Sequence, residues 1–465
     1  MKLKTSDIAK SIKAVRKNAA DQIIPGGYSI DSRTLSAGDC FFAIRGKNFD
    51  GHEYVAESIA KKASLIIANA ASAVPLDPGW PVLYVEDTSM ALRDLASAVR
   101  ELWGKCLIGI TGSNGKTTTK EIASFLLEAK FSVFKSIGNF NNEYGLPLSL
   151  LRLSEDHQFA VIEMGMSHRG EIHELCRIAR PDLGIVTNVR PAHLENFDSI
   201  QGIAAAKREL IESLPPNGVG ILNNDDRFVR KFGRVFSGKV LTFGMKSVAT
   251  YRATNIRSEG IEGNSFVLTY RSRKHQVRLP LIGEHNVANC LPAIALAHHL
   301  GMDFETISQS LLQFRPVSGR GEILRFGQGF TVINDTYNSN PAALQAMIHF
   351  LSSVPGFRRK ILVAGEMLEL GPSAAEFHQE CGRQAAVAGI DWVIGVSGLA
   401  EQLVAAASGH HPPPAIVQFF PEAVMAGEAL AQQVQPGDLI LMKGSRGVKT
   451  ERALEVLKKK FHPNN

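Results

Sequence analysis

Residues 109–119 combine three glycines with one lysine, the composition of a loop that binds phosphate. An apolar run, 106–111, leads into the segment, and a helical stretch, 120–129, follows it. Glycines let successive backbone N–H groups turn toward one set of oxygens, and a helix N-terminus adds partial positive charge. The expected nucleotide-binding residues are Thr111, Gly112, Ser113, Asn114, Gly115, Lys116, Thr117 and Thr118.

Within this loop, Lys116 is expected to contact the terminal phosphates and the Thr117 hydroxyl to bind Mg²⁺. Glu163 ends a second apolar run, 159–163. In a doubly wound sheet, ligands bind at the carboxyl ends of the strands, so Glu163 is a second candidate oxygen ligand for Mg²⁺. The alternative is that its carboxylate caps the next helix.

The composition indicates a protein of ordinary globular type. Its 465 residues suggest two to four domains, with 45% apolar and 21% charged residues. No apolar run is long enough to span a membrane. The first 18 residues are expected to form an amphipathic helix rather than a signal peptide, with Leu3, Ile8, Ile12 and Val15 on one face.

The charge and cysteine content narrow the function classes. Five scattered cysteines form no C-x-x-C pair, which favours a reduced, cytoplasmic location over a disulfide or zinc framework. The net charge of +6 comes without a basic run or alternating aromatic and basic residues. We therefore expect polyanionic small substrates such as nucleotides, and no nucleic acid.

Strand-like and helical segments alternate along most of the chain. This alternation predicts an α/β protein with mostly parallel sheets in three domains: residues 1–87, a central phosphate-loop domain 88–315, and a Rossmann-like domain 316–465. Thr88 is the expected N-cap of a helix that ends at Trp103, and 238–282 should add further strands. The predicted strands are 40–44, 65–68, 82–85, 106–111, 159–163, 184–188, 219–222, 330–334, 360–364, 392–396 and 438–442.

The loop T-G-S-N-G-K-T at 111–117 resembles the nucleotide loop of the Mur ligase family. Further segments are similar to that family, in the same order along nearly the whole chain. They lie at 31–33, 41–46, 49–52, 138–147, 163–166, 192–195, 206–209, 283–289, 319–322, 334–341, 365–371 and 443–446.

The resemblance implies an ATP-dependent ligase of cell-wall (peptidoglycan) synthesis. Segment 138–147 is similar to the member that joins D-alanyl-D-alanine to UDP-N-acetylmuramoyl-tripeptide. ATP would phosphorylate the tripeptide carboxylate, and the dipeptide amine would attack the resulting acyl phosphate. The cofactors implied are ATP and two Mg²⁺ ions.

The resemblance also assigns a second metal position to His193 and Lys207. A lysine cation cannot bind metal, but in the family this lysine can react with CO₂ to form a carbamate, which makes Lys207 a candidate for that modification. A surface or core role for His193, and a solvated helix face for Lys207, are the alternatives.

Other positions follow from the same resemblance. Asn286 and Asn289 would approach adenine, Arg320 would contact the γ-phosphate, and Asp335 would contact the ribose. Two alternatives remain open: Asn286 could cap a helix, and Arg320 could form an ion pair in a linker. Asn340 followed by Pro341 is more typical of a helix start. The residues expected to bind the two substrates are Ser32, Arg33, Asn141, Asn142, Glu143, Tyr337, Asn338, Lys443, Ser445 and Arg446.

Two alternative functions stay open. A sibling ligase adds a diamino acid to the dipeptide intermediate, but its D-N-P-R segment is absent here. A phosphate-loop NTPase that acts as a switch would leave Asp335, Lys443 and Arg446 unexplained. The sequence gives neither the third peptide residue of the substrate nor the oligomeric state.

Overall fold

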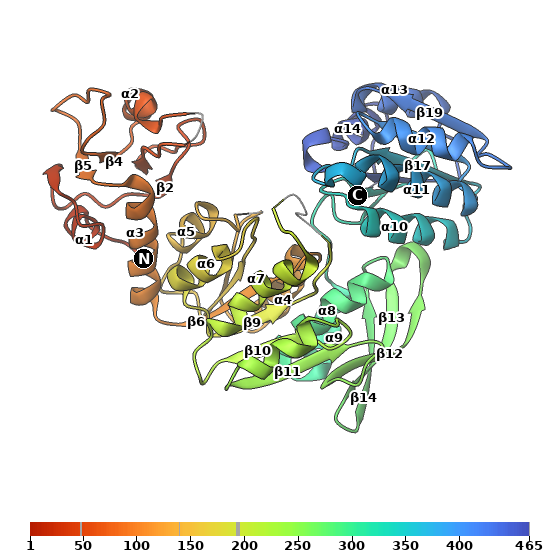
Figure 1. Cartoon of the computed structure of the whole chain (residues 1–465), viewed down its shortest axis with the longest axis horizontal. Helices are drawn as coiled ribbons and strands as arrows, with labels where there is room; N and C mark the ends of the chain where they lie inside the picture. Colours follow the sequence, from red (N-terminus) through yellow and green to blue (C-terminus); the bar gives the residue numbers. More distant parts are fainter. Residues whose placement is uncertain (47–48, 139, 192–195, 465) are drawn as a thin grey trace. The chain divides into compact units, whose positions relative to one another are not determined.

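The computed structural model describes residues 1–46, 49–138, 140–191 and 196–464 and contains three β-sheets (Figure 1). The chain forms two compact units. The first holds residues 1–189 and 201–242, and the second holds residues 190–200 and 243–465. Each unit is described by itself below.

The N-terminal sheet is parallel except at one edge. Its order is β1-β5-β4-β3-β2, with β1 antiparallel to β5. The buried core includes Phe41, Val55, Ile66 and Val82. The elements are α1 (Thr5–Ser11), β1 (Arg16–Asn18), β2 (Tyr28–Ser29), β3 (Cys40–Phe42), η1 (Gly51–Tyr54), α2 (Val55–Ala60), β4 (Leu65–Asn69) and β5 (Val82–Val85).

The prediction of one helix over the first 18 residues is wrong in its length. Helix α1 ends at Ser11, and Lys13 takes a left-handed backbone conformation with φ of 52°. The Val15 N–H then donates to the Tyr84 carbonyl oxygen at 2.8 Å, so Arg16–Asn18 pair with the sheet instead of continuing the helix. Hydrogen bonding of the chain to a strand edge outweighs the local helical pattern.

Helix α3 (Thr88–Trp103) has Asp87 rather than Thr88 as its N-cap. The Asp87 carboxylate accepts from the N–H groups of Ser89 and Met90 at 2.7 and 2.9 Å. Thr88 is the first helical residue, and its hydroxyl donates to the Ala43 carbonyl oxygen at 3.0 Å. Gly104, with φ of 62°, ends the helix.

The central strands of the first unit are parallel and lie in the order β10-β9-β6-β8-β7. Parallel strands end at one edge, so residues that follow different strands meet there. The elements are β6 (Cys106–Thr111), α4 (Lys116–Glu128), β7 (Val133–Lys135), α5 (Gly145–Leu150), β8 (Phe159–Glu163), α6 (Glu171–Ala179), β9 (Leu183–Val186), α7 (Ile200–Glu212), β10 (Val219–Asn223), η2 (Val229–Val235) and β11 (Lys239–Gly244).

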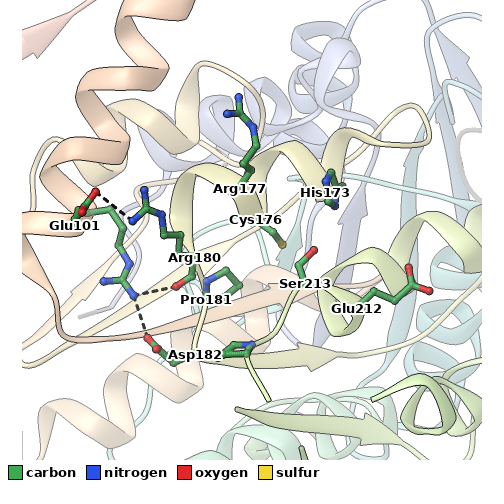
Figure 2. A pocket seen from close by; sticks show the side chains of 11 residues that line it. Glu101, His173, Cys176, Arg177, Arg180, Pro181, Asp182, Glu212 and Ser213 are labelled. Carbon is green, nitrogen blue, oxygen red and sulfur yellow. Dashed lines mark hydrogen bonds and ion pairs between the residues drawn. The ribbon is translucent and has the colours of Figure 1, made fainter. Parts of the chain in front are cut away.

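A pocket of about 580 Å³ lies at the opposite, amino edge of these strands. Asp182 precedes β9, and its carboxylate accepts from the Leu107 N–H at the start of β6 and from the Arg100 guanidinium. Figure 2 shows the lining side chains, including the ion pair between Glu101 and Arg180. These groups join α3 and α6 to the sheet, at the edge where the strands begin rather than where they end.

The second unit begins with three antiparallel strands and two helices and ends in a six-stranded sheet. That sheet has the order β15-β16-β20-β17-β18-β19 and is parallel except for β15. The first group is β12 (Tyr251–Ser258), η3 (Gly260–Glu262), β13 (Asn264–Tyr270), β14 (Arg273–Leu279), α8 (Glu284–His299) and α9 (Phe304–Leu312). The second is β15 (Glu322–Arg325), β16 (Thr331–Asp335), α10 (Pro341–Ser353), β17 (Arg359–Gly365), η4 (Gly371–Ser373), α11 (Ala374–Val387), β18 (Trp392–Val396), α12 (Ala400–Ser408), β19 (Ile416–Phe420), α13 (Ala423–Gln433), β20 (Asp438–Lys443), η5 (Arg446–Val448) and α14 (Glu451–Lys460).

Alternate residues of each strand in the six-stranded sheet face different cores. Leu362 and Ala364 of β17 pack with residues of α10, α11 and α12, whereas Ile361 and Val363 pack with residues of α13 and α14. Side chains of a strand alternate between faces, so an uninterrupted apolar run is buried on both sides. In Figure 1 these helices and their sheet form the teal to blue part of the chain.

The predicted three-domain α/β fold with mostly parallel sheets is confirmed. Each strand predicted from an apolar run is present, with its ends within two residues of the prediction. Residues 238–282 add strands, as expected. No helix in the described ranges is long and apolar enough to cross a membrane. The domain boundaries at 87/88 and 315/316 stay a prediction.

The Asp87 cap gives a test of this local structure. Replacing it with alanine should destabilise the start of α3 by about 1 kcal/mol, because two N–H groups lose their acceptor. Amide exchange in the first turn, measured by mass spectrometry, should rise roughly fivefold. The control Asp94→Ala, within the same helix, should leave that exchange unchanged; equal effects would contradict the assigned cap.

Candidate active site

The predicted phosphate loop connects strand β6 to helix α4. Helix α4 begins at Lys116, four residues earlier than the sequence pattern indicated. Gly112 and Gly115 both have positive φ, 151° and 81°. A Cβ atom at Gly112 would lie 1.8 Å from the Thr187 hydroxyl oxygen, so no side chain fits there. The glycines therefore set the path of the loop.

Two residues that sequence reasoning missed brace this loop. The N–H groups of Ser113 and Asn114 donate to the carbonyl and side-chain oxygens of Asn188 at 2.9 and 3.0 Å. The Thr187 hydroxyl donates to the Asn114 carbonyl oxygen at 2.7 Å. Both residues directly follow β9, which pairs with β6. Both lie at the end of the predicted strand 184–188, and this position at the carboxyl edge of the sheet was the available signal.

The N-terminus of α4 and Lys116 provide the positive charge of the loop. Gly115 is the N-cap and has no side chain to cover the first turn. The Lys116 ammonium donates to the carbonyl oxygens of Gly112 and Ser113 at 2.9 and 3.4 Å. Thr118 lies half-buried in the same turn, and Thr111 is anchored by a hydrogen bond to the Met164 carbonyl oxygen at 2.9 Å. A helix N-terminus beside an ammonium suits a polyanion.

Glu163 is held beside Thr117 at the carboxyl edge of the sheet. The Thr117 hydroxyl donates to one carboxylate oxygen at 2.7 Å and the Asn141 amide to the other at 2.8 Å. The residue is only 2% exposed, and no described cation forms an ion pair with it. Its carboxylate does not cap α6, which begins after Gly170. A buried carboxylate without a counter-ion favours a bound cation.

The donors at this position fit Mg²⁺. In the described part of the chain, no three His, Cys, Asp or Glu side chains gather to hold a metal by themselves. One hydroxyl and one carboxylate leave most positions of an octahedral ion for water and phosphate oxygens, as Mg²⁺ prefers.

Lys207 is buried in α7, 3% exposed, so the alternative of a solvated helix face is wrong. Burial, and then the nearby charge of Lys116, lower the pKa of its amine well below the usual value. An amine of low pKa spends more of its time neutral near pH 7. The predicted metal residue His193 lies within 192–195, outside the described residues.

The predicted substrate residues of the first unit make local contacts. The Ser32 hydroxyl donates to Glu57 at 3.1 Å, whereas the Arg33 side chain is 84% exposed and pairs with Asp31 at 2.7 Å. The Asp31 pKa is lowered, mainly by its hydrogen bond with Arg33.

Only one of the three polar residues at 141–143 reaches the loop region, through its bond to Glu163. Asn142 instead accepts from the Gly145 N–H at 2.9 Å at the start of α5, and Glu143 pairs with Arg93 of α3. The binding roles of Asn142 and Glu143 stay predictions.

A second polar cluster forms within the second unit, where β16 and β20 end side by side. The Lys443 ammonium, buried to 4% exposure, pairs with Asp335 at 2.6 Å and donates to the Asn338 carbonyl oxygen at 2.9 Å. Ser445 donates to the Ser339 carbonyl oxygen at 3.4 Å and accepts from the Leu368 N–H at 3.0 Å. The parallel pairing of Asp335 with Lys443 places both groups at one edge.

Two arginines border the same cluster. The Arg320 guanidinium lies 3.9 Å from the centre of the Tyr337 ring and that of Arg446 lies 5.7 Å from it. Arg446 also pairs with Glu451 at 3.5 Å. The structure thus brings together the predicted residues of 320–338 and 443–446. Asn340 caps α10 by accepting from the Ala343 N–H at 3.0 Å, the structural role expected of it.

The two asparagines predicted near adenine lie together inside α8. Asn286 donates to the Ile282 carbonyl oxygen at 2.8 Å and accepts from the Asn289 amide at 3.0 Å. The N-cap of α8 is Gly283, so the alternative of Asn286 as the cap is wrong. Their contact with adenine stays a prediction.

Comparison with known proteins decides the family. The Mur ligase family, catalytic domain, matches residues 26–101; the Mur ligase middle domain matches 110–297; and the Mur ligase, glutamate ligase domain, matches 319–446. The chain belongs to the Mur ligase family.

Several relatives that match this Mur ligase over nearly its full length share one function. UDP-N-acetylmuramoyl-tripeptide–D-alanyl-D-alanine ligase of Bacillus subtilis is 34% identical over 98% of each chain. MurF from Acinetobacter baumannii has a crystal structure with a TM-score of 0.90 and 31% identity over 99% of each chain. MurF of Thermotoga maritima, solved in complex with ADP, has a TM-score of 0.80 and 32% identity over 93% of this chain and 97% of its own.

The contact between Gly112 and Thr187 gives a test of the loop. Gly112→Ala should lower affinity for adenine nucleotides by about tenfold or more, because the new methyl group overlaps the Thr187 hydroxyl and displaces the loop. The control is Gly170→Ala, where φ is also positive but an added Cβ meets no atom within 4 Å. Titration calorimetry with ADP measures both, and equal affinities would contradict this account.

Proposed function

We propose that this Mur ligase joins D-alanyl-D-alanine to UDP-N-acetylmuramoyl-tripeptide with ATP, giving the pentapeptide precursor of peptidoglycan. The main structural support is the buried hydrogen bond beside the phosphate loop, in which the Thr117 hydroxyl donates to the Glu163 carboxylate at 2.7 Å. The full-length relatives with this name support the choice of substrates.

The reaction needs an activated carboxylate, because a free carboxylate is a poor electrophile. The tripeptide carboxylate oxygen attacks the γ-phosphorus of ATP, ADP leaves, and an acyl phosphate forms. The amine of D-alanyl-D-alanine then attacks the acyl carbon and loses a proton, and phosphate leaves. Positioned cationic groups stabilise the charge that passes between the oxygens.

In this scheme the loop residues hold the nucleotide. The Lys116 ammonium exchanges its bonds to the Gly112 and Ser113 carbonyl oxygens for bonds to phosphate oxygens. The N–H groups at the start of α4 face the same phosphates. Thr117 and Glu163 would hold Mg²⁺, which when bound would spread the charge of the phosphoryl group.

Lys207 is proposed to carry a carbamate. Its neutral amine attacks CO₂, a C–N bond forms and one proton is lost, leaving a carboxylate-like group. The burial of the residue and its proximity to Lys116 support this, because a carbamate anion would be stabilised by that ammonium. With His193, it would provide the second metal position.

The second-unit cluster is proposed to hold anionic substrate groups and part of ATP. The carboxylate of a peptide would be bound by Lys443, Ser445 and Arg446. The γ-phosphate would be bound by the Arg320 guanidinium. Asp335 suits ribose hydroxyls, with Asn286 and Asn289 near adenine. Tyr337 and Asn338 border the incoming peptide.

The predicted domains divide these tasks. Residues 1–87, with Ser32 and Arg33, bind the UDP part; 88–315 bind ATP; and 316–465 bind the incoming amine. The five free cysteines and the use of ATP support a cytoplasmic location.

A phosphate-release assay tests the function. Purified protein with Mg²⁺, ATP and UDP-linked tripeptide should release phosphate steadily only when D-alanyl-D-alanine is added. Steady release without peptide would favour an NTPase switch. Release with a diamino acid and the UDP-linked dipeptide instead would favour the sibling ligase.

Lys116→Ala should lower kcat by about 10² to 10³ or more, because a preorganised cation at the phosphates is lost. The circular dichroism spectrum and melting temperature should stay close to those of the wild type, since Lys116 is only half-buried and donates to carbonyl oxygens of its own loop. Activity near the wild-type level would contradict the mechanism.

Lys207 should take up labelled CO₂. Protein incubated with ¹³C-bicarbonate should show a carbamate carbon signal by NMR that is missing in Lys207→Ala. That variant should lose about 10- to 100-fold in activity, the usual cost of losing a group that orients a metal site. Recovery of activity on adding short carboxylic acids would support the carbamate. An unmodified amine at full occupancy under bicarbonate would contradict it.

A further inference from the structure

Lys120 is a fully buried charge to which the scheme above gives no task. It is 0% exposed and lies in α4. Its ammonium donates to the carbonyl oxygens of Ser136 and Gly138 at 2.7 and 3.3 Å and pairs with Glu121 at 3.1 Å. Burying an ammonium is costly unless all of its donors are bonded, as they are here.

The segment that Lys120 holds is the one that orients Glu163. The Ser136 hydroxyl accepts from the Glu163 N–H at 3.1 Å. Five residues later, the Asn141 amide donates to the Glu163 carboxylate at 2.8 Å. The same segment therefore fixes both the backbone and the side chain of Glu163.

The other end of this segment, at Asn141, is tightly packed against Gly165. The Gly165 N–H donates to the Asn141 carbonyl oxygen at 2.8 Å. A Cβ atom at Gly165 would lie 2.8 Å from the Asn141 side chain. A small shift of the segment would therefore move the Asn141 amide relative to Glu163.

We propose that Lys120 is a positioning residue for the phosphate and metal site, because its ammonium anchors the segment formed by the described residues 136–138 and 140–141 and thereby aims Glu163 at Thr117. Lys120 follows Lys116 and Thr117 by about one helical turn. One helix thus carries the groups for phosphate and metal together with the anchor of the carboxylate that faces them. This inference rests on the proposed function, which assigns Mg²⁺ to Thr117 and Glu163.

The alternative is that Lys120 serves only to neutralise the charge of Glu121, without any effect on the site. Lys135 also pairs with Glu121, at 2.9 Å, from a half-exposed position. Lys135→Met therefore makes the same chemical change beside the same carboxylate and leaves the bonds from Lys120 to Ser136 and Gly138 in place. It is the matched control.

The experiment compares Lys120→Met with Lys135→Met and the wild type. In Lys120→Met, the Mg²⁺ concentration for half-maximal rate should rise, and kcat fall, by about 10- to 100-fold, the usual effect of losing a group that orients a metal ligand. KM for D-alanyl-D-alanine should stay unchanged. Without nucleotide or metal, amide exchange of peptides that cover 136–141 and Glu163 should quicken. Lys135→Met should show none of these effects.

Ser136→Ala provides a second route if Lys120→Met does not fold. It removes the acceptor of the Glu163 N–H and should raise the Mg²⁺ requirement in the same direction. Where both variants fold, the double variant should cost less than the product of the two single effects, since both act through one segment.

The proposal is overturned if folded Lys120→Met keeps the wild-type Mg²⁺ requirement and exchange pattern, or if Ser136→Ala leaves that requirement unchanged. A wild type that makes no pentapeptide would instead refute the proposed function, and the exchange measurement would still report whether Lys120 anchors the segment.

Discussion

The site depends on one buried contact, between the carboxylate of Glu163 at the end of β8 and the hydroxyl of Thr117 in the first turn of α4. The Glu163 carboxylate is buried, and among the described residues it has no cationic partner and accepts hydrogen bonds from the hydroxyl of Thr117 and the amide of Asn141. Such a group is poised for a cation. The parallel pairing of β6 with β8 creates this contact, because it aligns the strand ends from which the loop and Glu163 emerge.

The same constraint operates in the second unit. There β16 and β20 run parallel and deliver Asp335 and Lys443 to one edge, where they form a nearly buried ion pair. Since both central strands of that sheet are buried on both faces, their ends are the positions at which polar groups can reach a ligand. In each unit, the sheet supplies a rigid support, and the candidate site residues gather at the ends of its strands and in the segments that follow them.

The sequence predicted what is encoded locally. The apolar runs fixed the strands, and the glycines with Lys116 identified the loop, because both signals depend on neighbouring residues. It failed where a distant contact decides the outcome. The Thr88 hydroxyl bonds to the distant Ala43 while Asp87 caps α3, and Arg16–Asn18 pair with β5 as a strand. Thr187 and Asn188 brace the loop from more than 70 positions away, and the burial of Lys207 is a property of the folded chain that an alanine-rich helix does not reveal.

The close approach of Gly112 to Thr187 links two positions that lie 75 residues apart in the chain. The space that a methyl group at 112 would need is already filled by a hydroxyl that bonds the loop. A larger group at 112 would therefore require a smaller one at 187, and a replacement without the hydroxyl would remove the brace. The brace that the Thr187 hydroxyl provides thus confines position 112 to glycine.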